Sequence, residues 1–95
     1  MRTRLTLMVY DVASDGRRGR LHRLLEQYGV AVQKSAFEAR LGLADRRHLL
    51  RLVEGLLDPK EDRFALYVIG PAQEQHIAVI GDSRPIIEEQ KWFSV

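Results

Sequence analysis

The chain opens with an apolar run from Arg4 to Asp11 in which successive side chains alternate between two faces, as in a β-strand. One face carries Leu5, Leu7 and Val9, and the other carries Thr6, Met8 and Tyr10. By the same alternation, Asp11 lies at the tip of the strand in register with the leucine face. Ser14, Asp15 and Gly16 then predict a turn, in which Ser14 or Asp15 is suited to cap a helix.

Two segments with apolar residues at helical spacing predict two helices, the first over residues 17–28 and the second over residues 44–57. We expect the first to end at Gly29, the residue type that commonly follows a helix. Asp45 is a candidate cap for the second, which Asp58 and Pro59 stop. The expected buried stripes are Leu21, Leu24, Leu25 and Tyr28 in the first helix, and Leu49, Leu50, Val53, Leu56 and Leu57 in the second.

The remaining patterns predict strands. Residues 30–41 are extended, either as one long bent strand or as two short ones, because no two-residue turn signal divides them. Residues 62–69 are apolar on both faces, which suits a central strand, and residues 77–80 form a short strand before Gly81. This order predicts one α+β domain over residues 1–95: a ferredoxin-like βαββαβ sandwich with an extra C-terminal strand, and two helices on one face of an antiparallel sheet.

The C-terminal segment, residues 82–95, carries Ile86, Ile87, Trp92 and Phe93. A domain of 95 residues has little core left to bury these groups. We expect the segment to form a last strand, or to pack on or exchange into a partner protomer, since large apolar groups often mark interfaces.

Composition narrows the class of protein. The chain has no cysteine, which excludes disulfides and thiolate metal sites. It shows no signal peptide and no apolar run near the ~20 residues of a membrane span, so we expect a cytoplasmic protein with no membrane partner. The net charge is only +2, but twelve of the fifteen basic residues are Arg. Arginine matches phosphate oxygens well, so the composition favours a nucleic-acid partner.

Asp11 and the arginines that follow it form the main candidate site. A carboxylate at a strand tip is a hard ligand suited to Mg²⁺ or Mn²⁺, and Arg17, Arg18 and Arg20 are suited to phosphate. The alternatives are a turn-forming Asp11 and a solvated helix face with salt bridges to Asp15 or Glu26. Nucleases commonly build their metal sites from several carboxylates, and this chain offers one. A two-fold dimer that brings two copies of Asp11 together would provide two.

Two further features concern binding. Ser35 is suited to position a phosphate or a water, although no adjacent base makes it a nucleophile. Phe37 is most simply a core residue, with base stacking or a dimer contact as its functional alternative. The three histidines share no metal-ligand spacing, and the chain has no glycine-rich phosphate loop.

Taken together, these motifs resemble those of the small CRISPR-associated adaptation protein family Cas2. The tip of the first strand, the start of the first helix and the later extended run appear in the family's order, over roughly the first eighty residues. The matching stretches are Val9-Tyr10-Asp11-Val12, Gly16-Arg17-Arg18, Leu24-Leu25 with Tyr28-Gly29, Val32-Gln33-Lys34-Ser35-Ala36-Phe37-Glu38, and Asp62-Arg63-Phe64-Ala65-Leu66-Tyr67.

The resemblance implies a ferredoxin-like homodimer with Mg²⁺, or Mn²⁺, held by Asp11 near the two-fold axis. It implies a metal-dependent endonuclease of single-stranded RNA or double-stranded DNA, with Asp11 and Tyr10 catalytic. It also implies a part in spacer acquisition as a scaffold for the integrase Cas1. The implied nucleic-acid contacts are Arg17, Arg18, Arg20, Ser35 and Phe37.

Two other functions remain open at this level. One is a VapD-like toxin ribonuclease with a similar fold and an Asp at the end of a strand. The other is a non-enzymatic ferredoxin-like nucleic-acid-binding module in which Asp11 only shapes a turn.

Overall fold

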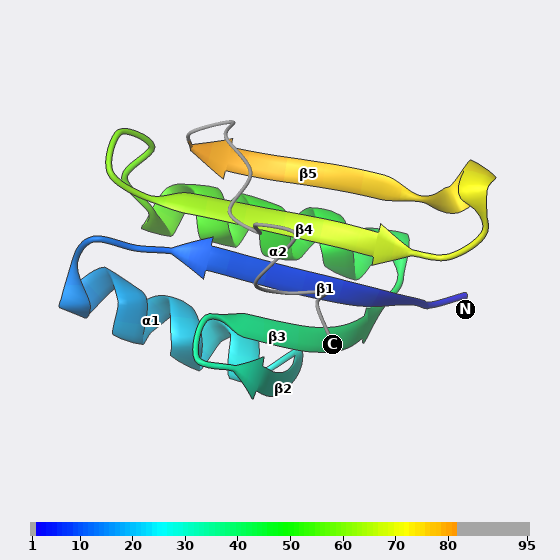
Figure 1. Cartoon of the computed structure of the whole chain (residues 1–95), viewed down its shortest axis with the longest axis horizontal. Helices are drawn as coiled ribbons and strands as arrows, with labels where there is room; N and C mark the ends of the chain where they lie inside the picture. Colours follow the sequence, from blue (N-terminus) through cyan, green and yellow to red (C-terminus); the bar gives the residue numbers. More distant parts are fainter. Residues whose placement is uncertain (1, 82–95) are drawn as a thin grey trace, which may run out of the picture.

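The structure, a computed structural model, describes residues 2–81 and contains one five-stranded sheet with two helices (Figure 1). The strands are antiparallel to their neighbours, in the order β2-β3-β1-β4-β5. This confirms the α+β ferredoxin-like prediction, with β5 as the extra strand. The elements are β1 (Arg4–Asp11), α1 (Asp15–Glu26), β2 (Gly29–Gln33), β3 (Ala36–Leu41), α2 (Leu43–Leu56), β4 (Arg63–Ile69), the 3-10 turn η1 (Ala72–Glu74) and β5 (His76–Gly81).

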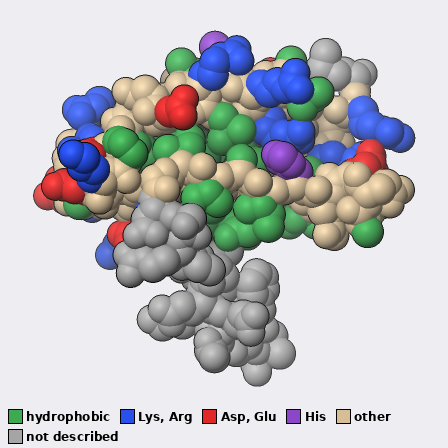
Figure 2. Space-filling view, turned by 90° about the horizontal axis from the view of Figure 1, so that it is seen from above, with side chains coloured by type: hydrophobic (Ala, Val, Ile, Leu, Met, Phe, Trp, Pro, Cys, Tyr) green, Lys and Arg blue, Asp and Glu red, His purple; other side chains and the backbone are tan. Residues whose placement is uncertain are grey.

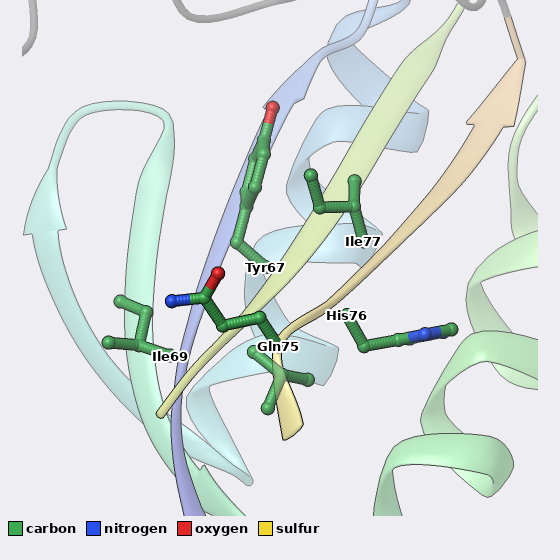
Figure 3. Close-up of a pocket in the computed structure, with 6 residues that line it drawn as sticks. Tyr67, Ile69, Gln75, His76 and Ile77 are labelled. Carbon is green, nitrogen blue, oxygen red and sulfur yellow. The ribbon is translucent and has the colours of Figure 1, made fainter. Parts of the chain in front are cut away.

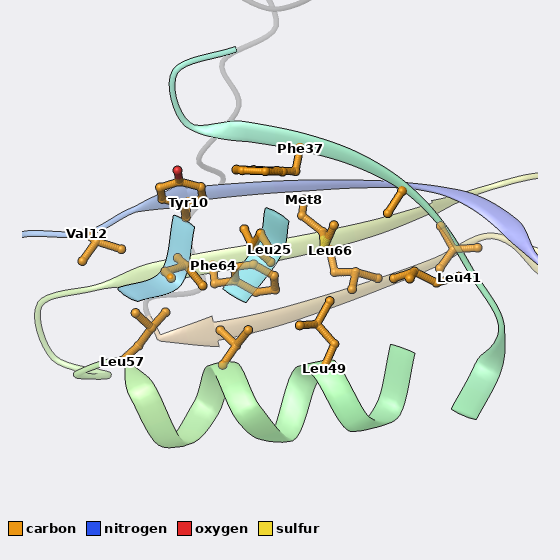
Figure 4. Packing of buried hydrophobic residues seen from close by; sticks show 14 residues of the cluster. Met8, Tyr10, Val12, Leu25, Phe37, Leu41, Leu49, Leu57, Phe64 and Leu66 are labelled. Carbon is orange, nitrogen blue, oxygen red and sulfur yellow. The ribbon is translucent and has the colours of Figure 1, made fainter. Parts of the chain in front are cut away.

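The main core lies between the sheet and the two helices (Figure 4). Alternation sends every second side chain of β1, β3 and β4 toward α1 and α2. Each fully buried apolar side chain contributes roughly 1.5–3 kcal/mol relative to exposure. The predicted helix stripes are confirmed, with Leu24, Tyr28, Leu50 and Leu56 at their margins. The fully buried members are Met8, Leu21, Leu25, Phe37, Leu49, Val53, Phe64 and Leu66.

The opposite face of the sheet carries no helix in the part of the chain that the structure describes, and we call it the open face. Register places Val9 beside Ala36 and Ala65, and these three form a small buried cluster. Asp11 and Arg63 share this face, directly opposite each other at its end. The sheet therefore sends Tyr10 into the core and its neighbour Asp11 to the open face.

The first helix differs from its predicted bounds. It begins at Asp15, where the Ser14 hydroxyl accepts from the Arg17 backbone N–H at 3.2 Å, so Ser14 is the cap. It ends at Glu26, and the prediction that Gly29 terminates it is wrong. Gly29 instead opens β2, where an added Cβ would lie 2.1 Å from the Glu38 carbonyl oxygen. Glycine is needed there for close approach of two strands.

Two other local predictions change. The second helix begins at Leu43 after Gly42, with no side-chain cap, so Asp45 lies in the first turn and does not cap it. The extended run divides into β2 and β3 at a turn over residues 34–35, which selects the two-strand alternative. The predicted pairing of residues 82–95 falls outside the described residues. No helix among residues 2–81 is both long enough and apolar enough to cross a membrane.

Asp62, directly before β4, ties together four parts of the fold. Its carboxylate accepts from Nε of Arg17 at 2.6 Å and from Nη2 at 3.1 Å. It also accepts from the backbone N–H groups of Ala13 at 2.9 Å and Asp58 at 2.8 Å. The Gly81 backbone, at φ 91°, packs so closely that a Cβ would lie 2.0 Å from the Asp62 carbonyl oxygen. The start of α1, the segment after α2, the start of β4 and the end of β5 therefore converge on one residue.

The charge of Asp62 is stabilised although its side chain is fully buried. Burial by itself raises the pKa of this carboxyl, but the hydrogen bonds from Arg17, Asp58 and Ala13 outweigh it, so the pKa is lowered. A carboxyl with a lower pKa in the folded state stabilises the fold above its unfolded pKa, about 3.8. That contribution is lost as the pH falls through the folded value.

Substitution of Gly29 tests the close approach of β2 and β3. We expect Gly29→Ala to lower the free energy of unfolding by about 1–3 kcal/mol, because the new Cβ meets backbone that cannot move aside. The control is Gly55→Ala on α2, where a Cβ meets nothing within 4 Å. Alanine favours the helix, so this control is expected to stabilise by about 0.5–1 kcal/mol. Equal urea midpoints for the two variants would contradict the prediction.

Substitution of Asp62 tests its role in holding the elements together. We expect Asp62→Asn to lower the free energy of unfolding by about 3 kcal/mol, because Arg17 loses its buried charged partner. Asp15→Asn, which removes an exposed partner of Arg18, is expected to cost less than about 1 kcal/mol. When urea denaturation is measured from pH 7 down to pH 2, the free energy of unfolding of wild type should fall below pH 3.8, the unfolded-state pKa of the Asp62 carboxyl, and Asp62→Asn should show a smaller fall. Similar costs for the two variants would overturn this role.

Candidate metal and phosphate site at the end of β1

Asp11 is the last residue of β1 and its carboxylate is exposed to solvent, with 64% of the side chain accessible. Its Oδ2 accepts from Nη2 of Arg63 at 2.9 Å. Arg63 opens β4 and is only 21% accessible, so its stem is packed on the sheet. The carboxylate is thus held on one side by a cation, while Oδ1 makes no hydrogen bond within residues 2–81.

Asp11 borders a hollow of about 350 Å³ between the end of β1, the start of α1 and the β2–β3 turn. The turn is held there because the Tyr10 backbone N–H donates to the Ser35 carbonyl at 3.1 Å. The lining combines one carboxylate with two cationic side chains, which suits a ligand carrying negative oxygens. The lining residues are Tyr10, Asp11, Val12, Arg18, Lys34 and Ser35.

Tyr10 belongs to the core and also lines this hollow. Its ring is buried among the core residues, and its hydroxyl lies 3.5 Å from the Lys34 carbonyl oxygen (Figure 4). Burial raises the pKa of this hydroxyl, and the nearby positive charge of Arg18 only partly opposes the change. Tyr10 is therefore neutral at pH 7, able to donate a proton in a hydrogen bond and unsuited to act as a base.

The three predicted arginine contacts differ in their surroundings. Arg18 lines the hollow, donates to the Val12 carbonyl at 2.7 Å and pairs with Asp15. Arg20 is exposed and forms no ion pair within residues 2–81. Arg17 instead turns inward to Asp62, so its guanidinium is committed to the fold. The structure thus places Arg17 in the ion pair with Asp62 and outside the lining of the hollow.

Phe37 lies in the core of the domain. Its side chain is fully buried, and its ring meets His22 edge to face at a centroid distance of 5.1 Å. A buried ring has no face available to a base, so Phe37 acts as a core residue, the simpler of the two predicted roles. Ser35 is half-buried and lines the hollow.

Two residues of the site, Lys34 and Arg63, were not among the predicted contacts. The signal for Arg63 lies in topology: in a ferredoxin-like sheet the first and fourth strands are neighbours and antiparallel, so the start of one meets the end of the other. Lys34 lies in the turn whose place beside Tyr10 depends on the pairing of β1 with β3.

The donor set fits one kind of metal site. Within residues 2–81, no group of three or more Asp, Glu, His or Cys side chains comes together. Mg²⁺ keeps several waters and binds through one or two carboxylates together with phosphate oxygens. Asp11 with its unpartnered Oδ1, beside cations suited to phosphate, fits such an ion and does not fit a metal caged wholly by protein side chains.

Comparison with known proteins places the chain in a family. The family model described as "CRISPR associated protein Cas2" matches residues 4–77. A Thermus thermophilus protein named CRISPR-associated endoribonuclease Cas2 is 39% identical over 71 residues, 75% of this chain and 76% of that protein. A Chloroflexus aurantiacus protein of the same family name is 36% identical over 80 residues, 83% of this chain and 86% of that protein.

Solved structures agree with this match. The crystal structure of a hypothetical protein from Thermus thermophilus has a TM-score of 0.71 and 36% identity, over 74% of this chain and 85% of that one. Streptococcus pyogenes Cas2 has a TM-score of 0.61 and 28% identity, over 70% of this chain and 86% of that one. The strand-tip Asp11, the two-helix antiparallel sheet and these matches together show that the chain belongs to the CRISPR-associated Cas2 family.

Proposed function

We propose that this chain is a Mg²⁺-dependent endonuclease of single-stranded RNA or double-stranded DNA that works as a homodimer in CRISPR spacer acquisition. The observation that carries the nuclease proposal is the exposed Asp11 carboxylate at the rim of a hollow lined by Arg18 and Lys34. Relatives in Thermus thermophilus and Chloroflexus aurantiacus are named endoribonucleases, which supports the same chemistry here.

The residues divide the work by charge and position. Asp11 would hold Mg²⁺, with Mn²⁺ as a chemically similar substitute. When bound, the ion would act as a Lewis acid and lower the pKa of a water bound to it. Arg18, Lys34 and the exposed Arg20 bind the phosphates on either side of the scissile bond. The Ser35 hydroxyl donates a hydrogen bond that orients a phosphate oxygen or a water in the hollow, while the neutral Tyr10 hydroxyl donates to the Lys34 carbonyl and holds Lys34 at the rim.

The open face supports the homodimer. It carries an apolar strip over β1, β4 and β5, including Tyr67, Ile69 and Ile77 around a hollow of about 490 Å³ (Figure 3). Figure 2 shows hydrophobic side chains on both sides of the β5 edge, whereas Lys and Arg lie mostly on one side of it. Ile77 is 61% and Val79 46% accessible, high values for large apolar residues. Because Asp11 lies on the same face, a two-fold axis through that face would bring two carboxylates toward one cleft.

Family membership supports the remaining parts of the proposal, which are a place in spacer acquisition and Cas1 as the protein partner. It also favours this function over the VapD-like toxin ribonuclease. The non-enzymatic module is distinguished from the nuclease by the first experiment below.

Substitution of Asp11 tests the nuclease. We expect Asp11→Asn to reduce Mg²⁺-dependent cleavage of labelled single-stranded RNA or duplex DNA by about 100-fold or more, because the metal loses its side-chain ligand. Asp45→Asn is the matched control, since it removes an exposed carboxylate from α2. Chelation by EDTA should abolish the activity of wild type.

The possible results separate the functions. Activity lost in Asp11→Asn and kept in Asp45→Asn supports the nuclease and identifies its substrate. Absence of metal-dependent cleavage in wild type would favour a non-catalytic binding protein. Equal activity in both variants would remove Asp11 from the mechanism.

Substitution of Ile77 tests the homodimer. We expect wild type to sediment as a dimer and Ile77→Lys to shift toward monomer, because a charge would be buried in the apolar interface. The matched control is Leu52→Lys, at an exposed apolar position of α2 on the helix side, where no change is expected. A monomeric wild type, or dissociation by Leu52→Lys and not by Ile77→Lys, would contradict an interface through the open face.

A further inference from the structure

We propose that Arg63 exchanges partners during the reaction: it pairs with Asp11 in the free protein, and passes to a nucleic-acid phosphate when Asp11 takes up a divalent ion. This inference rests on the proposed function and adds a residue to it. It follows from the contact between Nη2 of Arg63 and Oδ2 of Asp11, at 2.9 Å, directly across the β1–β4 pair.

The two side chains differ in freedom. Arg63 is 21% accessible and its stem is packed on the open face, so its guanidinium is confined to the rim of the site. Asp11 is 64% accessible, and Arg63 is its single hydrogen-bond partner within residues 2–81. The carboxylate can therefore change partner while the arginine remains where it is.

Electrostatic repulsion couples metal binding at Asp11 to the release of the Arg63 guanidinium. A divalent cation at Asp11 competes with the guanidinium for the same carboxylate and repels it. The guanidinium is then an uncompensated cation beside the metal, where the two non-bridging oxygens of a nucleic-acid phosphate can accept hydrogen bonds from its planar fork. The neighbouring carboxylate, Asp62, cannot change partners in this way, because its side chain is fully buried and already accepts hydrogen bonds from Ala13, Arg17 and Asp58.

Arg63 also differs from Arg17 and Arg18 in the groups to which it is bonded. Arg17 is committed to Asp62, and Arg18 is already bonded to the Val12 carbonyl and to Asp15. Of these three arginines, Arg63 is the one whose carboxylate partner is the candidate metal ligand. Its predicted effect on metal binding is therefore opposite in sign to its effect on nucleic-acid binding.

The first test measures Mn²⁺ affinity calorimetrically, without nucleic acid, for wild type, Arg63→Gln, Asp11→Asn and Arg51→Gln. We expect Arg63→Gln to bind Mn²⁺ about two- to fivefold more tightly than wild type, since an exposed ion pair no longer competes. Arg51→Gln removes the same charge from an exposed position of α2 and should match wild type. Asp11→Asn should lose the binding.

The second test measures binding of a short labelled single-stranded RNA with and without Mn²⁺. We expect Mn²⁺ to strengthen binding by wild type and by Arg51→Gln, and to do so less for Arg63→Gln, because no guanidinium is released. Circular dichroism and the urea midpoint establish that each variant is folded.

Each result bears on a different claim. Tighter Mn²⁺ binding by Arg63→Gln with a smaller gain for RNA supports the exchange. If Asp11→Asn loses Mn²⁺ binding but Arg63→Gln matches wild type, the role of Arg63 is overturned and the metal site stands. If Asp11→Asn binds Mn²⁺ as wild type does, or neither wild type nor Arg63→Gln binds it, the metal site and this inference both fail.

Discussion

The buried ion pair between Asp62 and Arg17 is the interaction on which the arrangement of the site depends. The chain places Asp62 just before β4 and Arg17 in the first turn of α1, and their contact fixes the start of the helix against the start of the strand. The same carboxylate accepts the Ala13 N–H, so it also holds the loop that leaves Asp11. A buried charge is stable only when its partners are in place, which makes this contact an all-or-none constraint on the loop.

The alternation of side chains along the strands determines which residues are buried in the core and which line the candidate site. Tyr10 and Asp11 are neighbours in sequence, yet one is buried against the helices and the other is exposed on the open face. This follows from the two-residue period of a strand. The core therefore supports the backbone that carries the candidate metal ligand, while the carboxylate itself is exposed to solvent.

The arginines show how one residue type serves different purposes. Arg17 stabilises the fold, Arg18 supports the loop and borders the hollow, and Arg63 faces the candidate metal ligand. By sequence position Arg17 and Arg18 were equivalent candidates for phosphate binding, whereas Arg63 was not a candidate. What separates them is the nearest carboxylate, and each of the three has a different one.

The types of the elements, the helix stripes, the ferredoxin-like order and the place of Asp11 at a strand tip could all be predicted from the sequence, because they depend on local periodicity and turn residues. The sequence did not determine the bounds of α1, the role of Gly29 or the burial of Phe37 in preference to its functional alternative. The contacts of Arg17 with Asp62 and of Asp11 with Arg63 are set by the three-dimensional fold, since these partners lie 45 and 52 residues apart in the sequence. The Asp11–Arg63 contact arises from the pairing of β1 with β4, and the Arg17–Asp62 contact from the placement of the start of α1 beside the start of β4. No local pattern specifies which distant charge will lie opposite.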